Sequence, residues 1–98
     1  MAKATLLYDE KRTYADGCIL QARLWIVPVS VRGSNHLLKY SLYYGRQGER
    51  LVAYDNEAGK GDHRHYGDRE EPYTFSTVEQ LVADFLQDVG ALRGPGNV

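Results

Sequence analysis

The densest group of chemically active side chains in this sequence lies between Tyr54 and His65. It holds carboxylates, imidazoles and cations within a dozen positions, and its members are Asp55, Glu57, Asp62, His63, His65, Lys60 and Arg64. Imidazole exchanges protons near neutral pH, and a fixed cation stabilises charge that develops on a phosphate. We therefore expect the function of the chain to reside in this segment.

One chemistry that these residue types support is cleavage of RNA without a metal ion. His63 and His65 are the candidate acid and base. One would remove the proton of the ribose 2′-hydroxyl, and the other would protonate the departing oxygen. Asp55, Glu57 or Asp62 would orient them as further catalytic residues, and Lys60 and Arg64 are the candidate phosphate-binding residues. In an extended segment both histidines point to one side and Arg64 points to the other, so all three converge only where the chain bends.

Two other interpretations of the same segment remain open. Asp55, Glu57 or Asp62 beside one or both histidines would also make a divalent metal site, although no recognised metal-binding spacing is matched. The remaining interpretation is a solvated loop in which Asp62 and Arg64 form local hydrogen bonds. The first interpretation needs no cofactor, and the second needs a divalent ion.

Length and composition indicate one domain of ordinary globular type. The chain has 98 residues and a formal net charge of −1, which argues against coating nucleic acid through bulk electrostatics. Cys18 is the single cysteine, which excludes an intramolecular disulfide, and we expect a buried structural thiol there. No apolar run is long enough to span a membrane and the start does not resemble a signal peptide, so a soluble, cytoplasmic protein is expected.

The first three quarters of the sequence alternate with a period of two, which predicts antiparallel strands. The predicted strands are residues 5–12, 18–27, 36–44 and 49–55, and residues 73–75 are a candidate fifth strand. Residues 56–72 are predicted to form a long loop, a type of segment that often carries function. Most of the eight tyrosines are assigned to the core or to a protein interface, with base stacking as the alternative.

One helix is predicted near the C-terminus. Ser76 and Glu79 form a capping box, and an apolar stripe of period 3.6 runs from Val78 to Val89. The fold class is therefore α+β, a small antiparallel sheet of four to five strands covered on one face by a single C-terminal amphipathic helix. The domain is predicted to span residues 1–92, followed by a flexible tail at residues 93–98.

Several sequence blocks together resemble the TumE family. They are residues 24–28 (LWIVP), 39–42 (KYSL), 54–57 (YDNE), 59–65 (GKGDHRH) and 71–73 (EPY), followed by the amphipathic helix. The resemblance covers most of the chain, and its Asp-Asn-Glu to His-Arg-His block is specific.

The resemblance implies the toxin of a toxin-antitoxin pair, encoded beside a helix-turn-helix antitoxin that binds and neutralises it. Ribonuclease activity is our own hypothesis and not an established property of the family. Residues 45–71 carry five basic and seven acidic side chains, which suits a basic protein partner as well as RNA. The alternative function is therefore a binding protein without catalysis, and a homodimer through an uncovered sheet face is also predicted.

Overall fold

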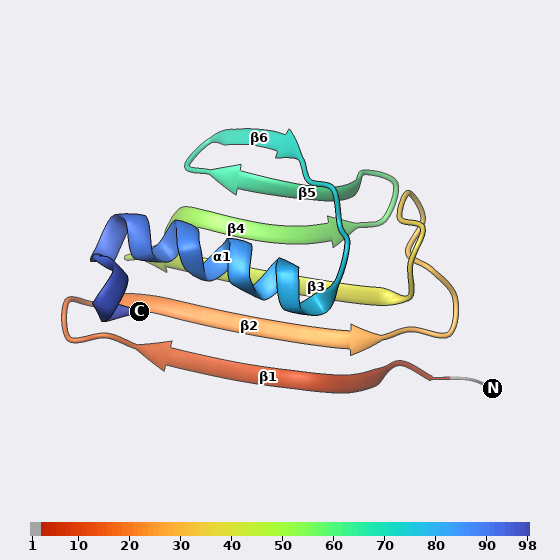
Figure 1. Ribbon diagram of the computed structural model, residues 1–98, viewed down its shortest axis with the longest axis horizontal. Coiled ribbons are helices and arrows are strands. Elements are labelled where there is room, and N and C mark those ends of the chain that lie inside the picture. Colours follow the sequence, from red (N-terminus) through yellow and green to blue (C-terminus); the bar gives the residue numbers. More distant parts are fainter. Residues whose placement is uncertain (1–2) are drawn as a thin grey trace.

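The computed structural model describes residues 3–98 as one antiparallel sheet with a C-terminal helix (Figure 1). Residues 1 and 2, which fall within the predicted domain, lie outside the described part of the chain. The strands are β1 (Thr5–Thr13), β2 (Cys18–Ile26), β3 (Leu38–Arg46), β4 (Glu49–Glu57), β5 (Gly61–Tyr66) and β6 (Arg69–Pro72). They are followed by α1 (Val78–Arg93) and a short 3-10 helix, η1 (Pro95–Asn97).

The six strands lie side by side in the order in which they occur along the chain. The α+β class is confirmed, but the predicted number of four to five strands is wrong. The long loop predicted at residues 56–72 is also wrong, because it contains β5 and β6, while residues 73–75 form no strand. Two tight turns, at residues 58–60 and 67–68, replace the loop and keep the chain in the sheet.

The hydrophobic core lies between α1 and one face of the sheet. The sheet contributes alternate residues of its central strands, and α1 contributes Leu81, Phe85 and Val89, each at most 1 % exposed. Cys18 belongs to this core at 4 % exposure, as expected for a structural thiol. Three of the tyrosines assigned to the core are indeed buried there: Tyr40, Tyr44 and Tyr54.

The helix begins one residue later than the capping box predicts. Thr77 is the N-cap, and its side-chain oxygen accepts a hydrogen bond from the Gln80 amide at 3.0 Å. The helix continues through Gly90 and ends at Arg93, and Gly94 is its C-cap, with a positive φ of 95° that suits a helix terminus. The residues predicted to form a flexible tail include η1, and Val98 packs against the core.

The helix lies across the middle of the sheet and leaves the β1 side open (Figure 1). A groove of about 1100 Å³ separates α1 from β1, with side chains of β2 at its floor. Leu7 and Tyr8 of β1 and Leu86 of α1 line this groove and are substantially exposed. No helix within residues 3–98 has the length and apolar character needed to cross a membrane.

Candidate functional site

Strand β5 divides the predicted site residues between its two faces. Residues of a strand alternate between faces, so His63 and His65 point to one side while Asp62 and Arg64 point to the other. Tyr54 of β4, which packs against α1, pairs with Arg64, so Arg64 lies on the helix side. The chain does not bend to bring Arg64 to the histidines.

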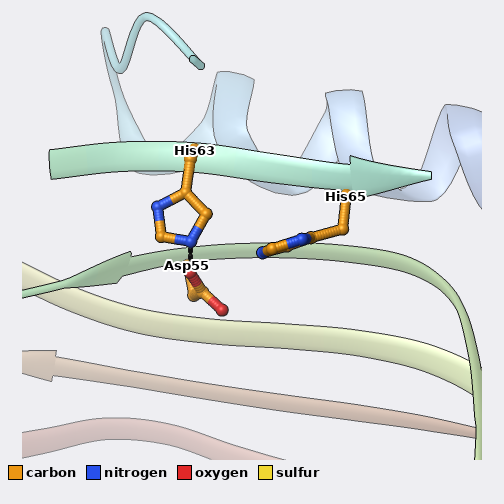
Figure 2. A group of neighbouring side chains, drawn as sticks. All are labelled: Asp55, His63 and His65. Carbon is orange, nitrogen blue, oxygen red and sulfur yellow. Dashed lines mark ion pairs between the residues drawn. The ribbon is translucent and has the colours of Figure 1, made fainter. Parts of the chain in front are cut away.

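Asp55, His63 and His65 form a compact group on the face away from α1, which we call the histidine cluster (Figure 2). Asp55 of β4 lies directly opposite His63 in the ladder. Each residue offers one oxygen or nitrogen atom, and these three atoms lie within 4.8 Å of one another. Because all three side chains project from paired strands, the ladder fixes their relative positions.

Hydrogen bonding orients the ring of His63. Its Nδ1 lies 2.9 Å from the Gly61 carbonyl oxygen, which only accepts, so Nδ1 carries a proton and donates. Its Nε2 faces Asp55 Oδ1 at 2.5 Å, drawn as an ion pair in Figure 2. Two atoms 2.5 Å apart are too close to have a metal ion between them, because a tetrahedral ion holds its donor atoms about 3.3 Å apart.

The cluster also contains buried polar atoms whose hydrogen-bonding capacity is unused. Within residues 3–98, Asp55 Oδ1 and His65 Nδ1 are buried and have no hydrogen-bond partner, since the 2.5 Å contact of Asp55 lacks hydrogen-bond alignment. His63 and His65 are 4 % and 5 % exposed, whereas the Asp55 side chain is 32 % exposed. The cluster therefore reaches the surface at Asp55. Unsatisfied buried polar atoms are rare in folded proteins and call for an explanation.

His65 differs from His63 in its electrostatic surroundings. Burial, with the positive charge of Arg50, lowers the pKa of His65 and favours the neutral imidazole. Its Nδ1 lies 3.8 Å from a carboxylate oxygen of Glu70, which is opposite His65 on β6. The two imidazole rings meet edge to face, with centroids 4.9 Å apart.

A close backbone contact supports the carbonyl that orients His63. Gly33, in the loop between β2 and β3, has a φ of 99°, and a Cβ at this position would lie 2.7 Å from the Gly61 amide nitrogen. Only glycine allows the loop to approach β5 so closely. The loop also accepts a hydrogen bond from Gly59 at the Arg32 carbonyl, at 2.7 Å.

Asp62 lies on the helix side, away from the two cluster histidines, and its carboxylate has three side-chain hydrogen-bonding partners there. Its carboxylate accepts from Ser34 Oγ at 2.5 Å and from the Tyr40 hydroxyl at 2.7 Å, and it lies 2.7 Å from His36 Nε2. His36 Nδ1 accepts from the Leu38 amide, so Nε2 donates to Asp62. This arrangement ties the loop between β2 and β3 to β5. His36 itself stacks on Phe75, with ring centroids 3.9 Å apart.

Arg64 lies in a second polar network on the helix side. Its Nε donates to Glu71 at 2.6 Å, and its guanidinium lies 5.4 to 5.9 Å from the ring centroids of Tyr54, Tyr66 and Tyr73. Asp88 of α1 accepts from the hydroxyls of Tyr54, at 2.5 Å, and Tyr66, at 2.7 Å. Burial, with the hydrogen bond to Asp88, raises the pKa of Tyr54 and keeps its hydroxyl protonated. This network joins the helix to β4 and β5.

Glu57 and Lys60 lie at the turn between β4 and β5. The Lys60 ammonium is 3.7 Å from carboxylate oxygens of both Glu57 and Glu70, and each of these three side chains is more than 40 % exposed. Of the predicted site residues, the structure therefore brings Asp55, His63 and His65 together. It places Glu57 and Lys60 at the edge of that group, and Asp62 and Arg64 on the other face.

Glu70 and Arg50 are neighbours of the cluster that the sequence analysis missed. Glu70 comes close to His65 because β6 folds back along β5, and β6 was predicted as loop. The signal that would have found it is the Gly67-Asp68 pair, a typical two-residue hairpin turn that directly follows the alternating residues of β5.

The family model described as Toxin TumE matches residues 3–93 of the 98-residue chain. The chain belongs to the TumE toxin family. The matched region contains all six strands and the whole of α1, and so includes the histidine cluster and both helix-side networks.

Membership identifies the protein as a toxin of a toxin-antitoxin pair and implies an antitoxin partner. No curated protein and no solved structure matches the chain. The chemistry of the toxin therefore has to be inferred from its own side chains.

Proposed function

We propose that this toxin cleaves RNA by general acid–base chemistry at the histidine cluster. The observation that supports the proposal is the pair of adjacent imidazoles in different hydrogen-bonding states. His63 is held between Asp55 and the Gly61 carbonyl, whereas His65 Nδ1 has no hydrogen-bond partner. Two adjacent imidazoles, one of which has a lowered pKa that favours its neutral form, supply the groups that RNA cleavage requires as base and acid.

In this mechanism His65 is the base and His63 is the acid. His65 removes the proton of a ribose 2′-hydroxyl, and that oxygen attacks the adjacent phosphorus. The bond from phosphorus to the 5′-oxygen breaks, and His63 protonates the departing oxygen. The products are a 2′,3′-cyclic phosphate and a 5′-hydroxyl, and the Asp55 carboxylate, 2.5 Å from His63 Nε2, orients the ring of His63.

Phosphate binding is assigned to Lys60 in this proposal. Lys60 is the predicted phosphate-binding residue that lies at the edge of the cluster, where it contacts Glu70. Arg64 was predicted to share this role, but it is engaged by Glu71 and three tyrosine rings on the opposite face. Glu57 orients Lys60 through their ion pair at 3.7 Å.

The test is incubation of the purified, tag-free chain with single-stranded RNA in the presence of a chelator. We expect fragments with 5′-hydroxyl ends, and His63→Gln or His65→Gln should slow cleavage by about 10²- to 10⁴-fold. The control His36→Gln, which changes the histidine outside the cluster, should retain most of the activity. RNA that stays intact both with chelator and with added divalent ions would refute the proposal.

A second candidate function is binding without catalysis, and the groove between α1 and β1 favours it. We propose that an apolar segment of a helix-turn-helix antitoxin occupies this groove, because its lining includes the exposed side chains Leu7, Tyr8 and Leu86. Leu7→Glu should weaken antitoxin binding at least tenfold and leave RNA cleavage unchanged. Unaltered growth inhibition by His63→Gln and His65→Gln would favour this candidate over catalysis.

The predicted homodimer would use the same side of the molecule. Strand β1 is a nine-residue edge strand, and Leu6 and Leu7 on it are about half exposed. Unpaired strand edges with apolar side chains favour pairing with another chain. Light scattering that gives a monomer at all accessible concentrations would remove the homodimer and leave the groove to the antitoxin.

A further inference from the structure

We infer that the histidine cluster is a binding site for one first-row divalent transition-metal ion, with Asp55, His63 and His65 as its protein ligands. The inference concerns binding and stands independently of RNA cleavage. It also defines a second state of the proposed catalytic site, because an ion that takes the imidazole lone pairs removes the groups that would transfer protons.

The first argument is the set of ligand atoms. Two histidines and one carboxylate with a remaining open position are the ligand set of many zinc and iron sites. The three donor atoms here lie within 4.8 Å of one another, and a tetrahedral ion places its donors about 3.3 Å apart. Small side-chain rotations reach that spacing, since the contact between Asp55 and His63 opens while the longer separations close.

The second argument is that one buried ligand atom, Asp55 Oδ1, and the non-ligating ring nitrogen of His65, Nδ1, have no hydrogen-bond partner. Asp55 Oδ1 is buried without a hydrogen bond, and it lies 2.5 Å from His63 Nε2 without the alignment that a shared proton prefers. His65 is 95 % buried and its Nδ1 is likewise unpartnered. A bound cation would give Asp55 Oδ1 and His63 Nε2 a common partner. It would also leave His65 Nδ1 free to donate to the nearby carboxylate of Glu70.

The third argument is that neighbouring groups are arranged as partners of metal ligands. A ligating histidine usually donates its other ring N–H to a carbonyl or carboxylate. His63 Nδ1 donates to the Gly61 carbonyl at 2.9 Å, and His65 Nδ1 faces Glu70 at 3.8 Å. Glu70 is therefore a positioning residue for the ion, and the open fourth position lies toward the surface at Asp55.

The nature of the donors selects the ion. Imidazole nitrogen suits Zn²⁺, Co²⁺ and Ni²⁺, whereas Mg²⁺ and Ca²⁺ prefer an all-oxygen environment. Ala53, opposite His65 in the ladder, is a small residue and is 5 % exposed, so the wall of the site on this side carries no competing polar side chain. We expect micromolar or tighter Zn²⁺ binding and no measurable Mg²⁺ binding.

The test uses the tag-free full chain freed of metal by chelation and dialysis. Calorimetric titration with ZnCl₂ should give one ion per chain, and Co²⁺ should produce the visible absorption of a four-coordinate site. Asp55→Asn and His65→Gln should each weaken Zn²⁺ binding by at least tenfold. The control Glu49→Gln, which changes an exposed carboxylate at the start of the same strand, should leave it unchanged.

Glu70→Gln separates positioning from a structural role. It should lower Zn²⁺ affinity by about 10- to 100-fold, while the melting temperature of the metal-free protein stays the same. Glu70→Asp should recover part of the affinity. Equal affinity in wild type and Glu70→Gln would overturn the assignment of Glu70.

The outcomes separate this inference from the proposed ribonuclease. If the folded wild-type chain binds neither Zn²⁺ nor Co²⁺, or if Asp55→Asn and His65→Gln bind as well as wild type, the metal site is refuted whatever the RNA assay shows. If Zn²⁺ binds and stops the RNA cleavage that is seen in chelator, the metal site and the metal-free ribonuclease mechanism are both supported. If Zn²⁺ binds and chelator abolishes cleavage, the metal site stands and the metal-free mechanism falls.

Discussion

The two faces of the sheet at β4 and β5 carry similar polar residue types but differ in how fully the polar atoms are hydrogen bonded. On the helix side, Asp62 and Arg64 have hydrogen-bonding partners for their charged groups, and Asp88 accepts from two tyrosines. On the other side, Asp55 and His65 keep buried atoms without partners. The first arrangement stabilises the fold, because it satisfies groups that are costly to bury. The second forgoes stability and retains atoms free to bind or react.

Asp88→Ala tests the helix side and should have the largest effect on stability. It removes the acceptor of the hydroxyl of Tyr54, which is 0 % exposed, and also that of Tyr66. We expect the free energy of unfolding in urea to fall by about 2 to 3 kcal/mol, the cost of unsatisfied buried groups. The matched variant Asp55→Ala, on the other side, should change it by less than about 0.5 kcal/mol. Equal losses in the two variants would remove the distinction between the faces.

Asp62→Asn tests whether this carboxylate takes part in the chemistry. The amide retains one oxygen but no charge, so the bonds from Ser34, His36 and Tyr40 weaken. The free energy of unfolding should fall by about 1 kcal/mol. Zn²⁺ affinity and the rate of RNA cleavage should stay within about twofold of wild type. A large loss of RNA cleavage in a folded Asp62→Asn protein would show that Asp62 takes part in catalysis.

His65→Leu should have the smallest effect on stability and the opposite sign. It replaces a buried ring that has an unpartnered nitrogen with an apolar side chain, which is often neutral or stabilising. We expect the free energy of unfolding of the metal-free protein, measured in urea, to stay the same or to rise by up to about 1 kcal/mol. Zn²⁺ binding should be lost. A clear destabilisation would show that the ring serves the fold.

Much of the fold follows from the sequence, and the site follows only in part. Alternation along residues 18–27 predicts β2, which the structure gives as Cys18–Ile26, and the spacing from Val78 to Val89 predicts α1. The same alternation places His63 and His65 on one side and Arg64 on the other. The position of Asp55 opposite His63 depends on the register of β4 and β5, which the turn at residues 58–60 sets.

What the sequence did not provide is the environment of each group. Asp62 and Asp55 look equivalent in the sequence, yet the loop between β2 and β3 supplies partners to Asp62 alone. Glu70 reaches His65 only through a four-residue strand that lacks a strong alternating pattern. Partners that come from distant segments depend on tertiary packing, which local patterns do not record.

The order of elements along the chain has a consequence for synthesis on the ribosome. Each strand pairs with the next one, so the sheet can assemble hairpin by hairpin as the chain emerges. Leu81, Phe85 and Val89 come last, and until they arrive the core residues of the sheet lack their contacts with the helix. A nascent chain that ends before Val78 already contains the whole histidine cluster but cannot close its core. We therefore expect toxicity to appear only when synthesis is nearly complete.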